Sequence, residues 1–432
     1  MKFTAVGDIL VQKRLPETYE GFEEIKEFIE QGDARFFNLE TTLNYEGECF
    51  ASQFSGGTYI RTNPEMYYDM LRYGFNMVSA NNNHAFDFSF EGFARTLETL
   101  NESGIVHAGI GNNLHQASAP AYLETPKGRV ALISVSTSFN AAMMAGEQSR
   151  RVAGRPGVNG IRWTQKVVVP KEDFEAIQRV GDKCGINCSK KIFRGEGYYP
   201  ELPEGVAEIG EQQYILGDDY GLVYELNKKD IERLKASISE AKTCADYVMV
   251  SVHHHQNEGM DKANVPEFHK ELFRGIIDWG ADAVVGHGPH LLRAIEVYKE
   301  KPIFYSLGDF LIQLYDVAFA PEDFYVKYGM NSDDSVIELL KKRSKDFTTG
   351  LMAQKEMREA IIPLWETDEN NNLVSLKLMP VYASCGEGKY IEGLPQRAKD
   401  TAFMEKLAEI SKPYGVEITP DSDGIWNCRW EN

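Results

Sequence analysis

The chain has 432 residues, of which 43% are hydrophobic and 26% are charged, a composition typical of a globular protein with a sizeable core. Its net charge of −19 argues against a nucleic-acid-binding surface, which needs a basic face. An anionic substrate would have to be attracted locally, by bound metals or by individual Arg and Lys side chains.

Targeting and redox signals are weak along the chain. No stretch is apolar enough to span a bilayer, and the N-terminus lacks the apolar segment and cleavage site of a signal peptide. We therefore expect a soluble, cytoplasmic protein, or one associated with the membrane or envelope if a leader has been removed. The six cysteines are scattered and predict no disulfide framework; Cys184 and Cys188 lack the second ligand pair of a zinc site.

Apolar strands alternate with helical patterns in the first third of the chain. Strands are predicted at residues 2–6, 35–38, 76–80, 106–109 and 130–135, and helices at residues 22–29, 63–74 and 90–100. The helix at residues 63–74 opens with Asn63-Pro64, a capping residue followed by Pro in the first turn, and ends at Gly74.

The alternation of strands and helices is interrupted and then resumes in the rest of the chain. Residues 139–219 have little periodicity and are interpreted as an insertion over one edge of the fold, a candidate lid. Helices are then predicted at residues 227–241 and 266–279, strands at 247–252, 283–285 and 303–306, and a terminal hairpin at 360–365 and 373–379. This alternation favours a buried, mostly central sheet covered on both faces by helices, which is an α/β fold.

Side chains that can bind metals follow five of the predicted strands. These clusters are Gly7-Asp8, Asn38-Leu39-Glu40, Asn81-Asn82-Asn83-His84 with Asp87, His253-His254-His255, and His287 with His290. The last pair lies in a Gly/Pro turn directly after an apolar strand, so both imidazoles can point into one cleft at the carboxyl edge of the sheet. Carboxylate and amide oxygens mixed with imidazoles are typical of a two-metal hydrolytic site.

These segments, in this order, resemble the CapA or PGA_cap capsule-synthesis family, which belongs to the calcineurin-like metallophosphoesterase fold group. In the match the histidine clusters extend to Ser251-Val252-His253 and Gly286-His287-Gly288-Pro289-His290, and one further segment, Tyr305-Ser306-Leu307-Gly308-Asp309-Phe310, completes it. The resemblance implies a four-layer α/β/β/α sandwich, with a metallophosphoesterase-like domain at residues 1–385 and a C-terminal extension at 386–432. It also implies a role in capsule or poly-γ-glutamate biosynthesis.

The resemblance implies two divalent transition metals, of which Mn, Fe and Zn all suit the ligands. Six ligands are implied: Asp8, Glu40, Asn83, His253, His287 and His290. Asp8 would bind the first metal, Glu40 would bridge both, and Asn83 and His253 would bind the second. His287 and His290 would each complete one metal.

The catalytic assignment carried by the resemblance rests on His84 and Asp87. His84 would act as general acid or as a donor to the developing oxyanion, and Asp87 would orient its ring. The nucleophile would be a water activated by the metals.

The chain departs from the family pattern in three places. Leu10 stands where metallophosphoesterases carry the His of Asp-x-His, which predicts a weaker first metal site. His255 lies in a segment where the family commonly has His-Trp-Gly, and is a candidate replacement ligand or substrate contact. Asp309 replaces the Asn of Gly-Asn-Phe. With Asn38 and Arg61, His255 and Asp309 are the candidate substrate-binding residues, although a surface ion pair explains Arg61 equally well.

Three functions follow from this interpretation. The first is a metal-dependent hydrolase of phosphoester or amide-like bonds in capsule or poly-γ-glutamate biosynthesis. The second is an accessory protein that binds polymer with little turnover, and the third is a phosphoesterase with an unrelated intracellular role. The expected partner is an anionic small molecule or polymer, poly-γ-glutamate among them, and the sequence leaves the oligomeric state open.

Overall fold

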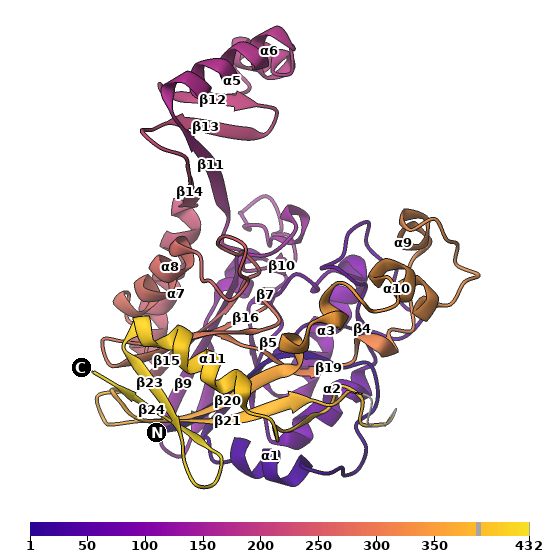
Figure 1. Ribbon diagram of the computed structural model, residues 1–432, viewed down its shortest axis with the longest axis vertical. Helices are drawn as coiled ribbons and strands as arrows, with labels where there is room; N and C mark the ends of the chain where they lie inside the picture. Colours follow the sequence, from indigo (N-terminus) through magenta and orange to yellow (C-terminus); the bar gives the residue numbers. More distant parts are fainter. Residues whose placement is uncertain (386–389, 432) are drawn as a thin grey trace. The chain divides into compact units, whose positions relative to one another are not determined.

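Two β-sheets lie face to face in the larger of two units of the protein (Figure 1). The computed structural model describes residues 1–385 and 390–431. Unit 1 comprises Met1–Gly160 and Glu232–Asn432, and unit 2 comprises Ile161–Ile231.

The first sheet of unit 1 has ten strands and contains the N-terminal strand near its centre. Its order is β23-β24-β21-β20-β1-β2-β5-β6, with β19 also pairing β1 and β22 pairing β21. The strands are β1 (Lys2–Leu10), β2 (Ala34–Leu39), β5 (Met77–Ser79), β6 (Val106–Ala108), β19 (Asp309–Ile312), β20 (Glu359–Thr367), β21 (Leu373–Ala383), β22 (Pro395–Arg397), β23 (Val416–Pro420) and β24 (Trp426–Trp430).

The second sheet has six strands in the order β17-β18-β16-β15-β9-β8. They are β8 (Ala121–Thr125), β9 (Gly128–Ser136), β15 (Tyr247–His253), β16 (Ala283–His287), β17 (Leu292–Tyr298) and β18 (Lys301–Leu307). The central pairs β9·β15, β15·β16 and β16·β18 are parallel, so the carboxyl ends of these four strands lie at one edge.

The two sheets are held together by a shared apolar core. Phe3 and Phe36 from the first sheet cluster with Leu132, Met249 and Phe304 from the second. Because side chains alternate along a strand, the neighbour of Phe36, Phe37, faces the opposite side and joins a different core. Burial on both faces explains why these strands are almost uniformly apolar.

Helices cover the outer face of each sheet. The first sheet carries α1 (Phe22–Ile29), α2 (Pro64–Met70) and α3 (Ser89–Ser103), whose buried side chains pack with Phe37 and Val78. The second is covered by α8 (Glu267–Asp278), where the Phe273 ring lies 5.1 Å from that of Tyr305, and by the unit 1 part of α7 (Lys228–Cys244). The predicted four-layer α/β/β/α architecture is confirmed.

Shorter elements complete unit 1, and unit 2 forms its own sheet. Unit 1 adds β3 (Thr42–Leu43), β4 (Arg61–Thr62), β7 (Ile110–Gly111), β10 (Gly157–Val158), α4 (Leu114–Ser118), α9 (Glu322–Lys327), α10 (Val336–Ser344) and α11 (Ala402–Ser411). Unit 2 contains β11 (Trp163–Val169), α5 (Lys171–Lys183), α6 (Cys188–Gly195), β12 (Val206–Ile209), β13 (Gln212–Leu216) and β14 (Gly221–Leu226). Its strand order is β12-β13-β11-β14.

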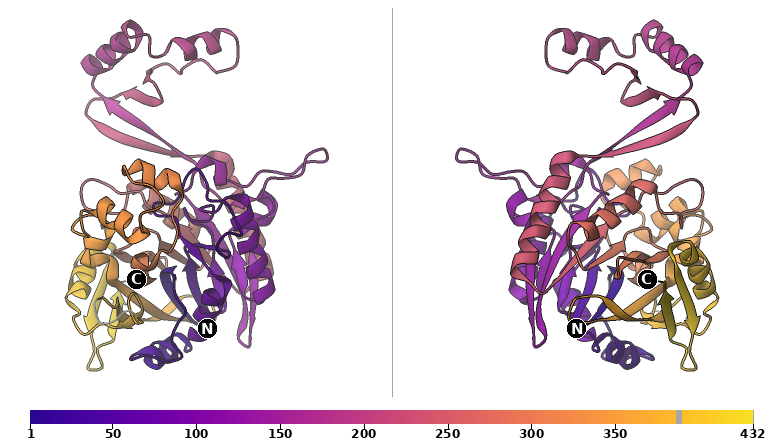
Figure 2. Two further views of the ribbon diagram at one scale, coloured as in Figure 1. Left: turned by 90° about the vertical axis from the view of Figure 1, so that its right-hand side faces the viewer. Right: turned by 90° about the vertical axis from the view of Figure 1, so that its left-hand side faces the viewer.

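Three boundaries differ from the sequence prediction. The separate unit covers 161–231 instead of 139–219, because β10 pairs with β7 of unit 1 and β14 pairs with β11. The described part of the predicted C-terminal extension, residues 390–431, joins the ten-stranded sheet, since β24 pairs with β21 (yellow and orange in Figures 1 and 2). The first strand continues to Leu10, because β19 pairs with its second half.

Across residues 1–385 and 390–431, no helix combines the length and the apolar character that a membrane crossing requires.

The close approach of β1 to Gly308, which lies between β18 and β19, generates a stability prediction. A Cβ added at Gly7 would lie 1.9 Å from the carbonyl oxygen of Gly308. This oxygen belongs to the backbone, so it cannot move aside as a flexible side chain could. We expect Gly7→Ala to lower the free energy of unfolding by about 3 kcal/mol or more, measured by chemical denaturation. Gly57→Ala is the control, because a Cβ at Gly57 meets nothing within 4 Å. Equal stability of the two variants would contradict the close approach.

Candidate metal centre

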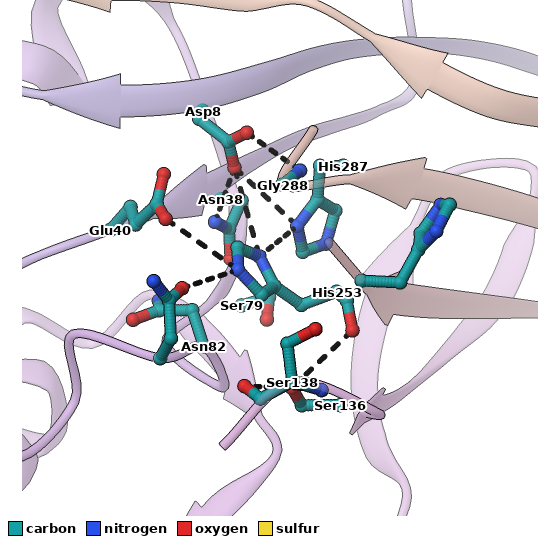
Figure 3. A network of polar contacts seen from close by, with 12 residues as sticks. Asp8, Asn38, Glu40, Ser79, Asn82, Ser136, Ser138, His253, His287 and Gly288 are labelled. Atoms are coloured by element: carbon teal, nitrogen blue, oxygen red, sulfur yellow. Dashed lines mark hydrogen bonds and ion pairs between the residues drawn. The ribbon is translucent and has the colours of Figure 1, made fainter. Parts of the chain in front are cut away.

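Polar side chains from both sheets converge where the parallel strands end (Figure 3). Strand register brings them together in pairs: Asp8 is opposite Asn38 and Asp309, and His253 is opposite His287. The side chains of Asp8, Glu40, His253 and His287 point toward one another in Figure 3. Strands β1, β2, β15 and β16, together with the start of β19, therefore bring these side chains to one buried polar centre.

Asp8 is held in place by two donors. The Asn38 amide donates to its Oδ1 at 2.7 Å, and the Gly288 backbone N–H donates to its Oδ2 at 2.8 Å. The Nδ1 of His287 lies 3.5 Å from the same Oδ1. Burial alone would raise the pKa of Asp8, but hydrogen bonding and charge attraction from His287, His290 and Asn38 bring it below the ordinary value. Asp8 is therefore ionised and held in a fixed orientation.

Glu40 faces an imidazole-rich group that also contains Asn83. Its Oε1 lies 3.5 Å from His253 Nε2 and 3.7 Å from His255 Nε2. The Asn83 Oδ1 lies 2.6 Å from His253 Nε2 and 3.1 Å from His255 Nε2. Burial, followed by repulsion from Asp8, raises the pKa of Glu40 well above the ordinary value. Burial, followed by repulsion between neighbouring imidazoles, holds the pKa of His253 well below its usual range.

His287 and His290, from the Gly/Pro turn, take different positions. The Nδ1 of His287 lies 2.9 Å from that of His253, while its Nε2 lies 2.6 Å from the Ser251 hydroxyl. His290 turns to Asp309, with Nδ1 2.9 Å from Oδ1. Burial opposes the charged form of His290, but Asp309, Glu40 and Asp8 outweigh it and raise its pKa to about 10. Burial raises the pKa of Asp309 to about 6.

The donor set of this centre fits divalent metal ions. Three groups have ligand atoms within 4.8 Å of one another: Asp8, His253 and His287; Glu40, His253 and His255; Asp8, His290 and Asp309. Neither carboxylate oxygen of the fully buried Glu40 has a hydrogen-bond partner. A buried carboxylate without partners calls for an ion, because leaving it unpaired costs free energy. Divalent metals satisfy Glu40 and match the mixed oxygen and nitrogen ligands.

His84 and Asp87 form a separate hydrogen-bonded pair beside Asn83. Asp87 Oδ2 lies 2.6 Å from His84 Nδ1 and accepts from the Ile60 N–H, and Asp87 Oδ1 accepts from the Gly56 N–H. Because this carboxylate accepts from two backbone donors, it acts as an acceptor toward His84 also. The Nδ1 therefore carries a proton and Nε2 is left as the functional nitrogen.

Two of the predicted substrate residues take up other contacts. Asn38 is fully buried and its amide is bound to Asp8, so we assign it to positioning Asp8 in place of substrate contact. Arg61 donates to the Asn63 side chain and the Asn44 carbonyl, and lies in a pocket of about 210 Å³ that Glu46 and Asp316 also line. None of its recorded contacts is with a residue of the metal centre.

Several supporting residues escaped the sequence analysis. A role for Ser251 could have been inferred from the sequence, since it shares a strand face with His253 two residues later. Gly56 had none: it lies in a glycine-rich loop, yet a Cβ there would lie 2.6 Å from His84 Nε2. Arg293 is fully buried and donates to His254 Nδ1 and to two backbone carbonyls. These bonds hold His254 away from the polar centre.

The molecule is thus a four-layer α/β/β/α protein with an oxygen- and imidazole-rich centre where its parallel strands end. The family described as "Bacterial capsule synthesis protein PGA_cap" matches residues 2–314. The chain belongs to this family.

Named relatives extend the comparison. The uncharacterized protein y4sH of Sinorhizobium fredii is 33% identical over 96% of this chain and 90% of its own length. The capsule biosynthesis protein CapA of Bacillus anthracis is 22% identical, over 72% of this chain and 59% of its own. A probable polyglutamine synthesis accessory protein, MT0602 of Mycobacterium tuberculosis, is 23% identical over 91% of this chain and 76% of its own length. A solved 5'-nucleotidase precursor from Thermus thermophilus aligns over 96% of this chain and 58% of its own at 9% identity, with a TM-score of only 0.35, too low to support an argument.

The unpaired Glu40 carboxylate predicts how the metal-free protein responds to mutation. Because its pKa is raised in the folded state, its contribution to stability is present at low pH and is lost as pH rises past the ordinary glutamate value. We expect Glu40→Gln to raise the free energy of unfolding at pH 7 in chelator by about 1–3 kcal/mol, and by less at pH 5.

The control for this measurement is a buried glutamate that has partners. Glu296 accepts hydrogen bonds from Arg274 and Tyr305, so Glu296→Gln should lower stability under the same conditions. If Glu40→Gln destabilises the metal-free protein as well, the Glu40 carboxylate is satisfied and the argument for an ion beside it fails.

Proposed function

We propose that this protein is a metal-dependent hydrolase of phosphoester or amide-like bonds that acts in capsule or poly-γ-glutamate biosynthesis. The family and the names of the Bacillus anthracis and Mycobacterium tuberculosis relatives support the biological role. The observation that carries the hydrolytic activity is the His84–Asp87 pair, joined at 2.6 Å beside Asn83 of the metal centre. A centre that only binds polymer has no need of an oriented imidazole.

The proposed metal ligands are the six residues expected from the resemblance: Asp8, Glu40, Asn83, His253, His287 and His290. Bound divalent metals would supply Lewis acidity and a water that is readily deprotonated near neutral pH. Asn38 and the Gly288 N–H fix the Asp8 carboxylate, and Ser251 fixes the His287 ring. These bonds hold the ligands in place before any ion binds.

His84 has the role of proton donor in this proposal. Asp87 holds its Nδ1, so Nε2 can give a proton to the oxygen or nitrogen that leaves as the bond to phosphorus or carbonyl carbon breaks. Water adds to the phosphorus or carbonyl carbon from which that group leaves, which completes the hydrolysis. Among the predicted substrate residues, His255 is best placed for contact, since its side chain keeps 29% exposure while Asn38 and Asp309 are fully buried.

A polymer-binding accessory protein is the second candidate. The description of the Mycobacterium tuberculosis relative as an accessory protein favours it. In that case the centre would retain its metals and its polymer ligand, and loss of the His84 side chain would leave polymer binding unchanged.

The two candidates are separated by His84→Asn. We expect the variant to keep its metals and to lose turnover about 10²–10⁴-fold, as removal of a general acid does. The measurement is a rate on a panel of phosphoesters and γ-glutamyl amides, with metal content determined on the same samples. His115→Asn, an exposed histidine outside the centre, is the matched control. Unchanged turnover in His84→Asn would reject the proposed mechanism, and unchanged polymer binding without turnover in the parent protein would favour the accessory role.

A further inference from the structure

We propose that Asp309 is a metal ligand and that it gives the centre two chemically different sites. Asp8, Asp309 and His290 form a carboxylate-rich site for a hard ion such as Mn²⁺. Glu40, Asn83, His253 and His255 form an imidazole-rich site suited to Zn²⁺, beside which His287 keeps the ligand role given above. This inference rests on the metal centre of the proposed function, and it replaces the earlier assignments of Asp309 and His255 to substrate binding.

The backbone places the two aspartates together. Strands β1 and β19 run parallel with Asp8 opposite Asp309, and the register shifts immediately afterwards. Residues opposite each other on neighbouring strands point to the same face of a sheet. The glycine directly before Asp8 allows a close approach to the segment that carries Asp309, since a Cβ on Gly7 would collide with the Gly308 carbonyl oxygen. Asp8 and Asp309 therefore share one buried edge.

One carboxylate oxygen of Asp309 has no hydrogen-bond partner and is free to bind a metal. The side chain is fully buried, and its Oδ2 has no hydrogen-bond partner, while Oδ1 contacts His290 Nδ1 at 2.9 Å. Ligand atoms of Asp8, His290 and Asp309 all lie within 4.8 Å of one another. His290 is held at a φ of 58°, a left-handed conformation that few non-glycine residues adopt, which is a sign of functional constraint.

The carboxylates of the centre have few cationic neighbours. Three fully buried carboxylates, Asp8, Glu40 and Asp309, meet here, and the ion pairs recorded for them in the described chain are all with histidines. Carboxylates buried together are costly without positive charge close by, and divalent cations would supply that charge at both ends of the centre.

The donor atoms differ between the two ends. Asp8 and Asp309 offer carboxylate oxygens with a single imidazole, a set that suits Mn²⁺, whereas the Glu40 end offers two imidazoles with an amide and a carboxylate oxygen. Leu10 does not weaken the first site, because it is packed in an apolar cluster with Ile312 and Leu314, and Asp309 supplies the third ligand.

The test is metal binding to the full chain, with Asp309→Asn as the variant that keeps the size and the hydrogen bond but removes the charge. Metal-stripped protein is loaded with one equivalent of Zn²⁺ and then dialysed against an excess of Mn²⁺, because Zn²⁺ binds most sites more tightly than Mn²⁺ does at equal concentration, and its metal content is measured by elemental analysis. We expect about one Mn²⁺ and one Zn²⁺ per parent chain. In Asp309→Asn we expect Mn²⁺ affinity, measured by calorimetry, to fall about 100-fold or more while Zn²⁺ is retained.

Two controls keep the outcome decisive. Asp282→Asn removes another buried aspartate, which is bound to Lys242 and the Val248 N–H, and should leave both metals in place. Anomalous diffraction at the Mn and Zn edges on the parent protein gives a reading that does not depend on how the variant folds. It should place Mn²⁺ at about 2.2 Å from an Asp309 oxygen.

Full Mn²⁺ affinity in Asp309→Asn, or Mn²⁺ lying away from Asp309 in the anomalous maps, would overturn the inference and leave the proposed hydrolase intact. Binding of no metal by the parent protein would overturn both. Metal binding as expected, combined with unchanged turnover in His84→Asn, would uphold the assignment of Asp309 and reject only the hydrolase.

Discussion

The burial of three carboxylates at one edge of the double sheet is the constraint on which the rest of the site depends. Asp8, Glu40 and Asp309 are all fully buried, and a carboxylate in that environment is costly unless positive charge is close by. The chain supplies imidazoles, most of which burial keeps neutral, and no Lys or Arg is ion-paired with these three residues in the described chain. Such a centre is an arrangement for binding cations, held together by the stability of the surrounding fold.

The surrounding fold can tolerate this cost because two separate apolar cores support the strands. One core lies between the sheets, and the other lies between the first sheet and its helices. The strands that carry the centre, β1 and β2, contribute to both cores and are therefore fixed on both faces. Their carboxyl ends are thereby held rigidly, which is what a set of preorganised ligands requires.

Much of this arrangement was predictable from the sequence, because it follows from strand periodicity and from polar residues at strand ends. The four layers, the terminal hairpin and the C-terminal stop at Gly74 are as predicted. The register of β1 with β19 was not predictable, because it joins segments far apart in the chain across a β-bulge. For the same reason, the contact of Asp309 with His290 and the close approach of Gly56 to His84 had no local signal. The limits of unit 2 were missed since strand pairing, and not composition, decides them.

The three consecutive histidines at the end of β15 differ in the partners of their ring nitrogens. Alternation sends His253 and His255 to one side and His254 to the other. On that other side, Arg293 donates to His254 Nδ1, which makes this nitrogen an acceptor, so Nε2 must donate to the Tyr305 carbonyl. Both nitrogens of His254 are thus occupied within the protein. Its neighbours have no such backbone partners for their Nε2 atoms, which meet Glu40 and Asn83. The side of the strand on which the buried Arg293 guanidinium lies thus determines which of the three histidines has both ring nitrogens bonded to Arg293 and the backbone.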